Sequence, residues 1–397
     1  MKKYILITGG ELFNKGAQAM TFIAVDHCKS LFPDHEIIVF SHRDSKRPAE
    51  EKRLYSFTFM PFPGFGESLS LITGLRRNHY KKKDRIGYFE MYQEIFKNAI
   101  MMLDISGYGI GSNWGIVKSR AYLRRIAVAK HFRIPVYLLP QSFGPFDYKG
   151  KHATLMKMEI SYYFNYPTMI MAREQESLDC IKKLCKKAHV IKTYDMVLQS
   201  QFINADNVYK EKQVFRVHNI LPKSVAVIPN SKNNSYGDET ENELLYKEII
   251  DSILKEGRPV YLIYHAIEDK EICKRIKRVY YHECEDVRTI DDEMNCIEFE
   301  DTVKNFDFVI ASRYHSIVHS YKKGIPALII GWAVKYRELS KVFHQEKYCF
   351  DISSVGERKK ILHAVGDLSK RHNEESIVIK DVLQTIQSRD VFDLICT

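Results

Sequence analysis

Short apolar runs rich in β-branched residues alternate along this chain with longer segments of helical period. This alternation is typical of parallel sheets covered by helices on both faces, because strands buried on both faces are apolar throughout. Segments such as 17–32 and 174–187 fit as helices between strands. In the first half, the predicted strands are 3–9, 36–41, 56–62, 100–106, 135–142, 168–173 and 189–195.

A polar stretch at 202–223 interrupts the alternation, which then restarts. The second half ends in helical segments, and its predicted strands are 224–230, 259–266, 287–291, 307–312 and 325–332. We therefore predict an α/β protein with two Rossmann-like lobes, residues 1–205 and 206–397. Each lobe has a parallel sheet, and a cleft lies between them.

The segment 62–86, "FPGFGESLSLITGLRRNHYKKKDRI", fits neither the strand nor the helix pattern. An apolar, glycine-containing stretch is followed there by a cluster of cations. One interpretation is a solvated surface loop. The other is a site that rests on an anionic membrane or gathers an anionic acceptor.

The composition restricts the partners and the compartment only partly. Sixty Lys and Arg against 50 Asp and Glu give a net charge of +10, which favours anionic partners without choosing among them. No RNP-like or helix-turn-helix signature accompanies this charge, so nucleic acid is not an expected partner. Eight scattered cysteines without a CxxC pair indicate a reducing compartment. The apolar N-terminal run is shorter than that of a signal peptide, and no run would span a membrane, so we expect a cytoplasmic protein.

Arg313 and His315 stand at the junction of the predicted strand 307–312 and the helix that follows. Ligands of open α/β sheets bind beyond the carboxyl ends of strands, where helix N-termini favour anions. An arginine there suits a carboxylate or a phosphate, and a histidine with a pKa near neutrality could donate a proton. The structural alternatives are a salt bridge for Arg313 and a satisfied buried imidazole for His315.

Two further cations follow strands in the same way. Arg173 precedes a helix after strand 168–173, and Lys335 opens a helix after strand 325–332. A capping or surface arginine and a solvated lysine are the alternatives. His315 and His319 have the spacing of zinc ligands on a helix, but no glutamate lies between them and no third ligand is evident, so no metal site is predicted.

Two glycine-containing turns follow strands in the first half. "SGYGIGSNWG" at 106–115 contains Gly107 and Gly109, and "GGELFNKGAQAM" at 9–20 places Asn14 and Lys15 at a helix N-terminus. Either turn could let the backbone approach a ligand, and tight-turn architecture explains both equally well.

Taken together, these segments resemble the polysaccharide pyruvyl transferase family, whose members are similar to GT-B glycosyltransferases in architecture. The resemblance covers most of the chain, and "SRYHSIVHSYKKGIPALIIGW" at 312–332, followed by Lys335, is its most specific part. The other segments that carry it are "NKGAQAM", "SGYGIGS", "LLPQSFGPF" at 138–146, "MAREQES" at 171–177 and the aspartate of "TYDMVL" at 193–198.

The resemblance implies that phosphoenolpyruvate is the donor, that a sugar or lipid-linked glycan is the acceptor, and that no cofactor is needed. It implies that Arg173, Arg313 and His315 hold the donor, with His315 as general acid and Arg313 beside the leaving phosphate. A role in cell-surface polysaccharide synthesis follows, with peripheral contact at the inner face of the membrane through residues 62–86. The further candidate substrate-binding residues are Tyr314, Lys335, Asn14, Lys15, Gly107, Gly109, Gln141 and Ser142.

Two features depart from the family pattern and leave other functions open. The glycine-rich turn lacks consecutive glycines, and Gln18 stands where an acidic residue is frequent. The alternative enzyme is a GT-B glycosyltransferase with a nucleotide-sugar donor, for which Glu298 or Glu300 could bind the ribose. A non-enzymatic basic protein that acts through residues 76–85 is the alternative of a different class.

Overall fold

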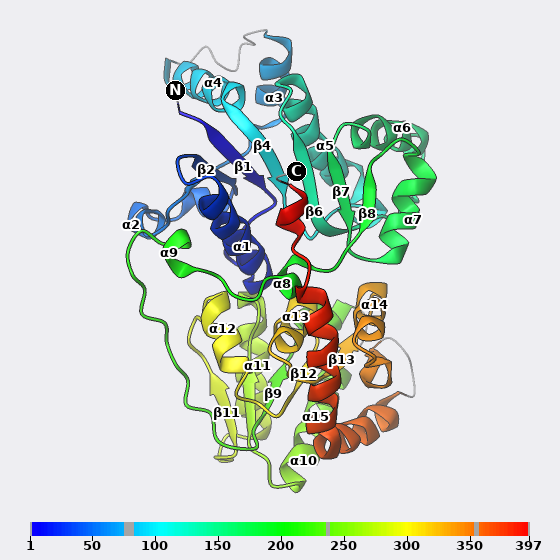
Figure 1. Ribbon diagram of the computed structural model, residues 1–397. Coiled ribbons are helices and arrows are strands. Elements are labelled where there is room, and N and C mark those ends of the chain that lie inside the picture. The colour runs from blue at the N-terminus through cyan, green and yellow to red at the C-terminus, as the bar shows by residue number, and fades with distance from the viewer. Residues whose placement is uncertain (1, 75–82, 236–238, 353–356, 396–397) are drawn as a thin grey trace.

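The computed structural model describes residues 2–74, 83–235, 239–352 and 357–395 of the chain. It consists of two lobes, each built on a parallel sheet with helices around it (Figure 1). The predicted α/β class with two Rossmann-like lobes is therefore confirmed.

The sheet of the first lobe has the strand order β3-β2-β1-β4-β6-β7-β8, and the short β5 pairs with β6. Its strands are β1 (Tyr4–Thr8), β2 (Glu36–Phe40), β3 (Thr58–Met60), β4 (Ala99–Asp104), β5 (Tyr108–Ile110), β6 (Val136–Phe143), β7 (Met169–Ala172) and β8 (Val190–Lys192). The helices described here are α1 (Lys15–Leu31), α2 (Ala49–Arg53), α3 (Phe65–Thr73), α4 (Lys83–Lys97), α5 (Gly115–His131), α6 (Ala153–Phe164), α7 (Gln175–Leu184), α8 (Met196–Gln199) and α9 (Ala205–Val208).

The sheet of the second lobe has the strand order β11-β10-β9-β12-β13-β14. Its strands are β9 (Val225–Ile228), β10 (Val260–Ile263), β11 (Val287–Ile290), β12 (Phe308–Ala311), β13 (Ala327–Gly331) and β14 (Cys349–Asp351). Its helices are α10 (Glu239–Lys255), α11 (Lys270–Tyr280), α12 (Cys296–Val303), α13 (Tyr314–Lys322), α14 (Val334–Val342) and α15 (Arg358–Gln387).

The alternation of side chains explains why strands such as β1 are apolar at every position. Ile5 and Ile7 enter one hydrophobic cluster, whereas Tyr4 and Leu6 enter a second cluster. Successive side chains of a strand point to opposite faces, so both faces of this sheet are covered. The same period-two logic holds for β9, where Ala226 belongs to a different cluster from its neighbours.

Local signals in the sequence fix the ends of the helices nearest the lobe interface. Asn14 caps α1, and its side-chain oxygen accepts a hydrogen bond from the Gly16 amide at 2.9 Å. Just after the C-terminal end of α13, Gly324 has a φ of +72°, which a glycine adopts without strain, and Pro326 follows two residues later. These caps set where α1 and α13 begin and end.

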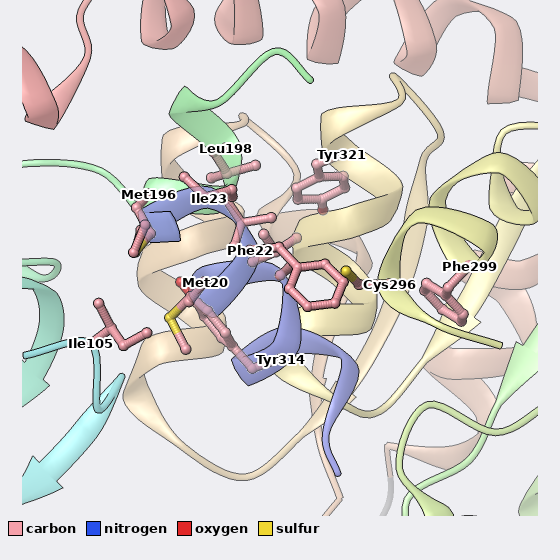
Figure 2. Packing of buried hydrophobic residues seen from close by; sticks show 14 of the residues in the cluster. Met20, Phe22, Ile23, Ile105, Met196, Leu198, Cys296, Phe299, Tyr314 and Tyr321 are labelled. Carbon is pink, nitrogen blue, oxygen red and sulfur yellow. The ribbon is translucent and has the colours of Figure 1, made fainter. Parts of the chain in front are cut away.

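The two lobes share one hydrophobic core. Phe22 and Ile23 on α1 lie in the same cluster as Tyr321 on α13 and Phe299 on α12 (Figure 2). A polar contact reinforces this packing, because the Gln18 side-chain oxygen accepts a hydrogen bond from the Cys296 amide at 2.7 Å. An amide oxygen thus satisfies a free N–H at the start of α12.

The chain crosses between the lobes more than once. The boundary predicted after residue 205 falls at the start of α9, which packs on α1 before the chain continues to β9. Beyond α15 the chain returns to the first lobe, where the Phe392 ring stacks on His27 with centroids 4.1 Å apart (Figure 1). The C-terminal segment therefore ties the second lobe back to α1.

The strands predicted from the sequence are confirmed, and the structure adds the short β5 and β14. The surface-loop interpretation of 62–86 is wrong over Phe65–Thr73, which forms α3 with Ser68, Ser70 and Leu71 buried. Two glycines of that stretch flank this helix: Gly64 is its N-cap residue and Gly74 is its C-cap residue. Residues 75–82, which include much of the cation cluster, lie outside the described residues.

Replacement of Phe22 by alanine should destabilise the protein by about 3–5 kcal/mol, because Phe22 is fully buried in the core that both lobes share. Urea unfolding followed by circular dichroism measures this loss. Val217→Ala serves as the control, since Val217 is 89% exposed and its replacement should change stability by no more than about 0.5 kcal/mol. Equal stability of the two variants would contradict a shared core.

Candidate functional site

Arg173 lies between the end of β7 and the start of α7, and its guanidinium is buried and fully engaged. It donates to Asp195 Oδ2 at 2.7 Å, to Glu174 Oε1 at 2.9 Å and to Ser142 Oγ at 2.7 Å. The Gly107 carbonyl accepts a longer bond of 3.3 Å. Two carboxylates therefore neutralise Arg173 while the glycine-rich turn holds it in place.

The aromatic ring of Tyr314 joins this group from the second lobe. The central guanidinium carbon of Arg173 lies 4.3 Å from the centroid of the ring. Lys335, in the first turn of α14, places its amino group 5.2 Å from the same centroid. The ring of the residue that opens α13 thus lies close to a cation of the first lobe and to a cation of the second.

Lys335 has no carboxylate partner among the described residues. Burial and then the positive charge of Arg173 lower its pKa to about 8, and Arg313 acts in the same direction. Both arginines therefore lie close enough to Lys335 to oppose its charge. The structure brings Arg173 and Lys335 together around the Tyr314 ring, whereas the guanidinium of Arg313 pairs with carboxylates of the loop after β10.

His315 faces Asp195 across the lobe interface. The Nε2 atom of His315 lies 3.7 Å from Asp195 Oδ2, the oxygen that also accepts from Arg173. A Cβ at Gly16 would lie 2.1 Å from the His315 ring, so only glycine allows the start of α1 to pack against it. His315 is consequently enclosed between α1 and Asp195.

The pKa of His315 differs from the value near neutrality that the sequence analysis expects. Burial lowers it to about 3, although the neighbouring Asp195 acts in the opposite direction. The expectation was wrong because a helix N-terminus at a sheet edge is here covered by the other lobe. The imidazole is neutral at physiological pH in this closed arrangement.

Asp195 is the residue on which these contacts converge. Its Oδ1 accepts from the Val197 amide and caps α8, while Oδ2 faces Arg173 and His315. Burial opposes its ionisation, but Arg173 lowers its pKa below the ordinary value, and the hydrogen bond from the Val197 amide acts in the same direction. Asp195 is therefore an ionised carboxylate that links the two lobes.

Arg313 is the N-cap residue of α13, and its guanidinium points toward the loop after β10. It donates to both carboxylate oxygens of Asp269, at 2.8 and 2.7 Å, and to Glu268 at 3.0 Å. Asp269 is fully buried. These contacts are those of the structural alternative, a buried salt bridge, and they place Arg313 beside the site with its charge compensated.

Asn14 and Lys15 join the lobes at the start of α1. Asn14 caps the helix and forms an isolated bridge with Ala266. The Lys15 amino group donates to the carbonyls of Tyr264 and His265, each at 3.2 Å, and burial lowers its pKa to about 8. In this arrangement Lys15 holds the loop after β10 against α1.

The remaining candidates of the first lobe lie behind Arg173. Gln141 is fully buried and binds the Asp104 side chain at 3.2 Å, so it supports the end of the sheet. Ser142 donates to Glu174 at 2.7 Å and accepts from Arg173. A Cβ at Gly109 would lie 2.5 Å from the Tyr122 ring, which gives that glycine a packing role.

Sequence reasoning assigned no site role to Asp195, Glu268, Asp269 or His265, although the structure places them around the candidates. Three of these residues follow β10 and the fourth follows β8. Their position beyond the carboxyl ends of parallel strands was the available signal. It was missed because an acidic residue in a loop is usually solvated.

The two carboxylates considered for a nucleotide-sugar donor are engaged elsewhere. Glu298 completes the capping box of α12 with Asn295 and also accepts from the Arg216 amide at 2.9 Å. Glu300 is buried between His319, Lys322 and Lys323. In the part of the chain that the structure describes, no group of three or more His, Cys, Asp or Glu residues could hold a metal ion.

Solved structures share this two-lobed fold at low sequence identity. The putative UDP-N-acetylglucosamine 2-epimerase from Listeria monocytogenes has a TM-score of 0.57 at 8% identity, covering 98% of this chain and 96% of that one. The structure of S. aureus MnaA with UDP has a TM-score of 0.56 at 10% sequence identity, covering 94% of this chain and 90% of that one. The structure of Medicago truncatula UGT71G1 with UDP-glucose has a TM-score of 0.52 at 12% sequence identity, covering 97% of this chain and 98% of that one. These neighbours establish a GT-B-like fold and nothing beyond it.

The sequence itself matches one family over most of its length. No curated protein matches the chain. The family model described as polysaccharide pyruvyl transferase matches residues 14–333, from the cap of α1 to the start of α14. This range includes Arg173, Arg313 and His315, and the chain belongs to the polysaccharide pyruvyl transferase family.

Proposed function

We propose that this transferase moves pyruvate from phosphoenolpyruvate onto two hydroxyls of a sugar or glycan intermediate, forms a ketal and releases phosphate. The observation that carries the proposal is the convergence of Arg173, Tyr314, His315 and Lys335 from both lobes. The first three of these residues lie within 14–333, the range that matches the family. The donor is small and carries several negative charges. Cations gathered near one aromatic ring suit such a ligand.

We assign the first contact with the donor to Lys335. Each arginine already pairs with two carboxylates, whereas Lys335 has none among the described residues and lies in the field of both arginines. An anion would relieve the repulsion among these three cations. Lys335 is therefore the group whose interactions improve most when a phosphate or carboxylate arrives.

His315 is the proposed general acid, and donor binding supplies the condition for its protonation. The imidazole is neutral in the closed arrangement because it is buried, with a pKa of about 3. A bound trianion would raise this pKa, and Asp195 at 3.7 Å would stabilise the resulting imidazolium. Protonation of His315 is thereby coupled to occupation of the site.

The proposed reaction balances protons with this one acid. His315 gives a proton to the methylene carbon, and the cationic central carbon is attacked by one acceptor hydroxyl, whose proton returns to His315. The bond from the central carbon to the phosphate oxygen then breaks. The second hydroxyl attacks, and its proton leaves with the phosphate. Arg313 and Lys335 stabilise the negative charge of the departing group.

We also propose that the protein acts in the cytoplasm, in cell-surface polysaccharide synthesis, and meets a lipid-linked acceptor at the inner face of the membrane. The scattered cysteines, without a CxxC pair, fit a reducing compartment. No described helix combines the length and apolar character that crossing a bilayer requires. Peripheral contact through residues 62–86 belongs to this proposal.

The alternative donor, a nucleotide sugar, has less support. Glu298 and Glu300 are held by a helix cap and by buried cations, so neither is available for ribose hydroxyls. The relatives with UDP or UDP-glucose share the fold at 12% identity or less, and a fold at this distance does not fix a donor.

Isothermal titration should show binding of phosphoenolpyruvate and no binding of UDP at the same concentration. The expected difference follows from a cationic site without a free ribose-binding carboxylate. Binding of UDP alone would contradict the proposed donor.

Replacement of His315 by glutamine should lower phosphate release from phosphoenolpyruvate and an acceptor by about 10²-fold or more, since glutamine cannot transfer a proton. A coupled phosphate assay over a panel of acceptor glycans measures this rate. His282→Gln is the matched control, because His282 is exposed on the surface of the second lobe. Near-normal turnover by the His315 variant would refute its role.

The affinity for sulfate, a dianion that does not titrate in this range, should fall as the pH rises through about 8. Lys335 is protonated below this pKa and neutral above it, and an anion binds the protonated form. The dissociation constant should increase toward about tenfold per pH unit above the midpoint, or more steeply if Lys15 contributes.

Lys335→Met should weaken sulfate binding near neutral pH and flatten this dependence. Lys187→Met, an exposed lysine beyond the end of α7, is the control and should behave as the wild type. Titration calorimetry across the pH range measures both. An affinity that is independent of pH in the wild type would remove Lys335 from the site.

A further inference from the structure

Three histidines at and next to the proposed donor site have buried ring nitrogens without a hydrogen-bond partner among the described residues. Both nitrogens of His265 and the Nε2 atoms of His315 and His319 are buried, and none has a hydrogen-bond partner among the described residues. His265 is 1% exposed and His319 is fully buried. The mechanism above uses His315 only, so the other two imidazoles need their own explanation.

His265 lies directly beyond the carboxyl end of β10, in the loop that α1 holds in place. Lys15 donates to its carbonyl at 3.2 Å, and Ala266 forms a bridge with Asn14. Its ring centroid lies 5.7 Å from that of His319 and 5.1 Å from that of Phe299. His265 therefore sits at the same sheet edge as the donor site, one layer deeper.

The ring of His319 is oriented by a buried carboxylate. Its Nδ1 lies 2.9 Å from Glu300 Oε1, and Glu300 also pairs with Lys322 and Lys323. Burial opposes the charge of Glu300, but Lys322 and His319 lower its pKa far below the ordinary value, so Glu300 is ionised and accepts the Nδ1 proton. With Nδ1 turned to this carboxylate, Nε2 is the ring nitrogen that remains without a partner among the described residues.

Unpaired nitrogens in such a position carry a stability cost. Each buried polar group without a partner costs about 1–3 kcal/mol, whereas an apolar group of the same shape would cost nothing. The Phe299 ring, which packs edge-on against His265, would pack against a phenyl ring in the same way. His265 contacts His319, which lies on the same helix as the proposed acid, so a titratable ring held here at a cost to stability points to proton chemistry.

We infer that His265, together with the oriented His319, stores and returns the proton that His315 delivers. The inference rests on the proposed function and adds to it a source for the proton. In this scheme His265 acts through His315 and is a positioning residue. One proton enters the imidazole cluster with the donor, passes through His315 to the methylene carbon, and is replaced by the proton of the first acceptor hydroxyl.

The charges around His265 explain why the store is empty before the donor binds. Burial lowers the pKa of His265 well below its ordinary value, and the cations Lys15 and Arg313 act in the same direction. The carboxylate on this side, Glu300, is already neutralised by lysines. A bound anion offsets the surrounding cations, so the cluster takes up a proton only when the site is occupied.

The experiment measures proton uptake as well as turnover. Binding of inorganic phosphate to the full-length protein is titrated by calorimetry in two buffers of different ionisation enthalpy, which gives the protons taken up per ligand. The variants are His265→Phe, which keeps a ring, and His319→Gln, which can still donate a hydrogen bond to Glu300. His282→Phe, at an exposed position, is the control.

We expect proton uptake near pH 7 in the wild type and in the control, and reduced uptake in both variants. His265→Phe should be as stable as the wild type or more stable in thermal unfolding. Its turnover should nevertheless fall about tenfold, less than the ~10²-fold loss expected when the residue that transfers the proton is removed.

The outcomes separate this inference from the function on which it rests. A wild type that releases no phosphate from phosphoenolpyruvate with any acceptor refutes the function, while reduced uptake in the variants still supports the proton store. Uptake equal to the wild type in His265→Phe, or no uptake in the wild type, overturns the store whether or not the enzyme is active. A variant that loses turnover and stability together, with unchanged uptake, shows a packing role and also overturns it.

Discussion

The ionised carboxylate of Asp195 is the constraint on which the site depends. One of its oxygens accepts from Arg173 and faces His315, while the other caps α8 at the point where the chain leaves the first sheet. Arg173 and His315 come from different lobes, so this carboxylate fixes how the lobes meet. A buried charge of this kind is tolerated only because a guanidinium, an imidazole and a backbone amide all face it.

Around that carboxylate, the protein keeps its cations in place by pairing them before any substrate arrives. Arg173 has Asp195 and Glu174, and Arg313 has Asp269 and Glu268. Unpaired arginines in this enclosed space would repel one another and hold the lobes apart. The pairing leaves Lys335 as the cation with the most to gain from a ligand, which gives binding a definite starting point.

The shared hydrophobic core makes this arrangement possible. α1 packs Phe22 against residues of α12 and α13, and the same helix brings Gly16 against His315 and Lys15 against the loop that carries His265 (Figure 2). Packing and polar contacts therefore position the same helix. The site is built from the interface of the lobes, and its geometry is as rigid as that interface.

The sequence by itself determined the architecture and the candidates. Apolar runs fixed the strands because parallel strands are buried on both faces, and Asn14 and Gly324 marked helix ends through their own backbone preferences. The segment around Arg313 and His315, at a strand-to-helix junction, carried the resemblance to a family whose model covers residues 14–333. These are local signals, and a local pattern is readable without the fold.

Only the tertiary structure decided which charges meet and which protonation state results. The sequence around Arg313 does not predict its pairing with Asp269, 44 residues away. The sequence around His315 does not predict its contact with Asp195, nor the burial that lowers its pKa to about 3. α3 was missed because its buried face depends on distant helices, which supply packing that no short window contains. The burial and the ion pairing of a side chain depend on residues far apart in the chain. The candidate side chains are therefore visible in the sequence, whereas their protonation states are set by the fold.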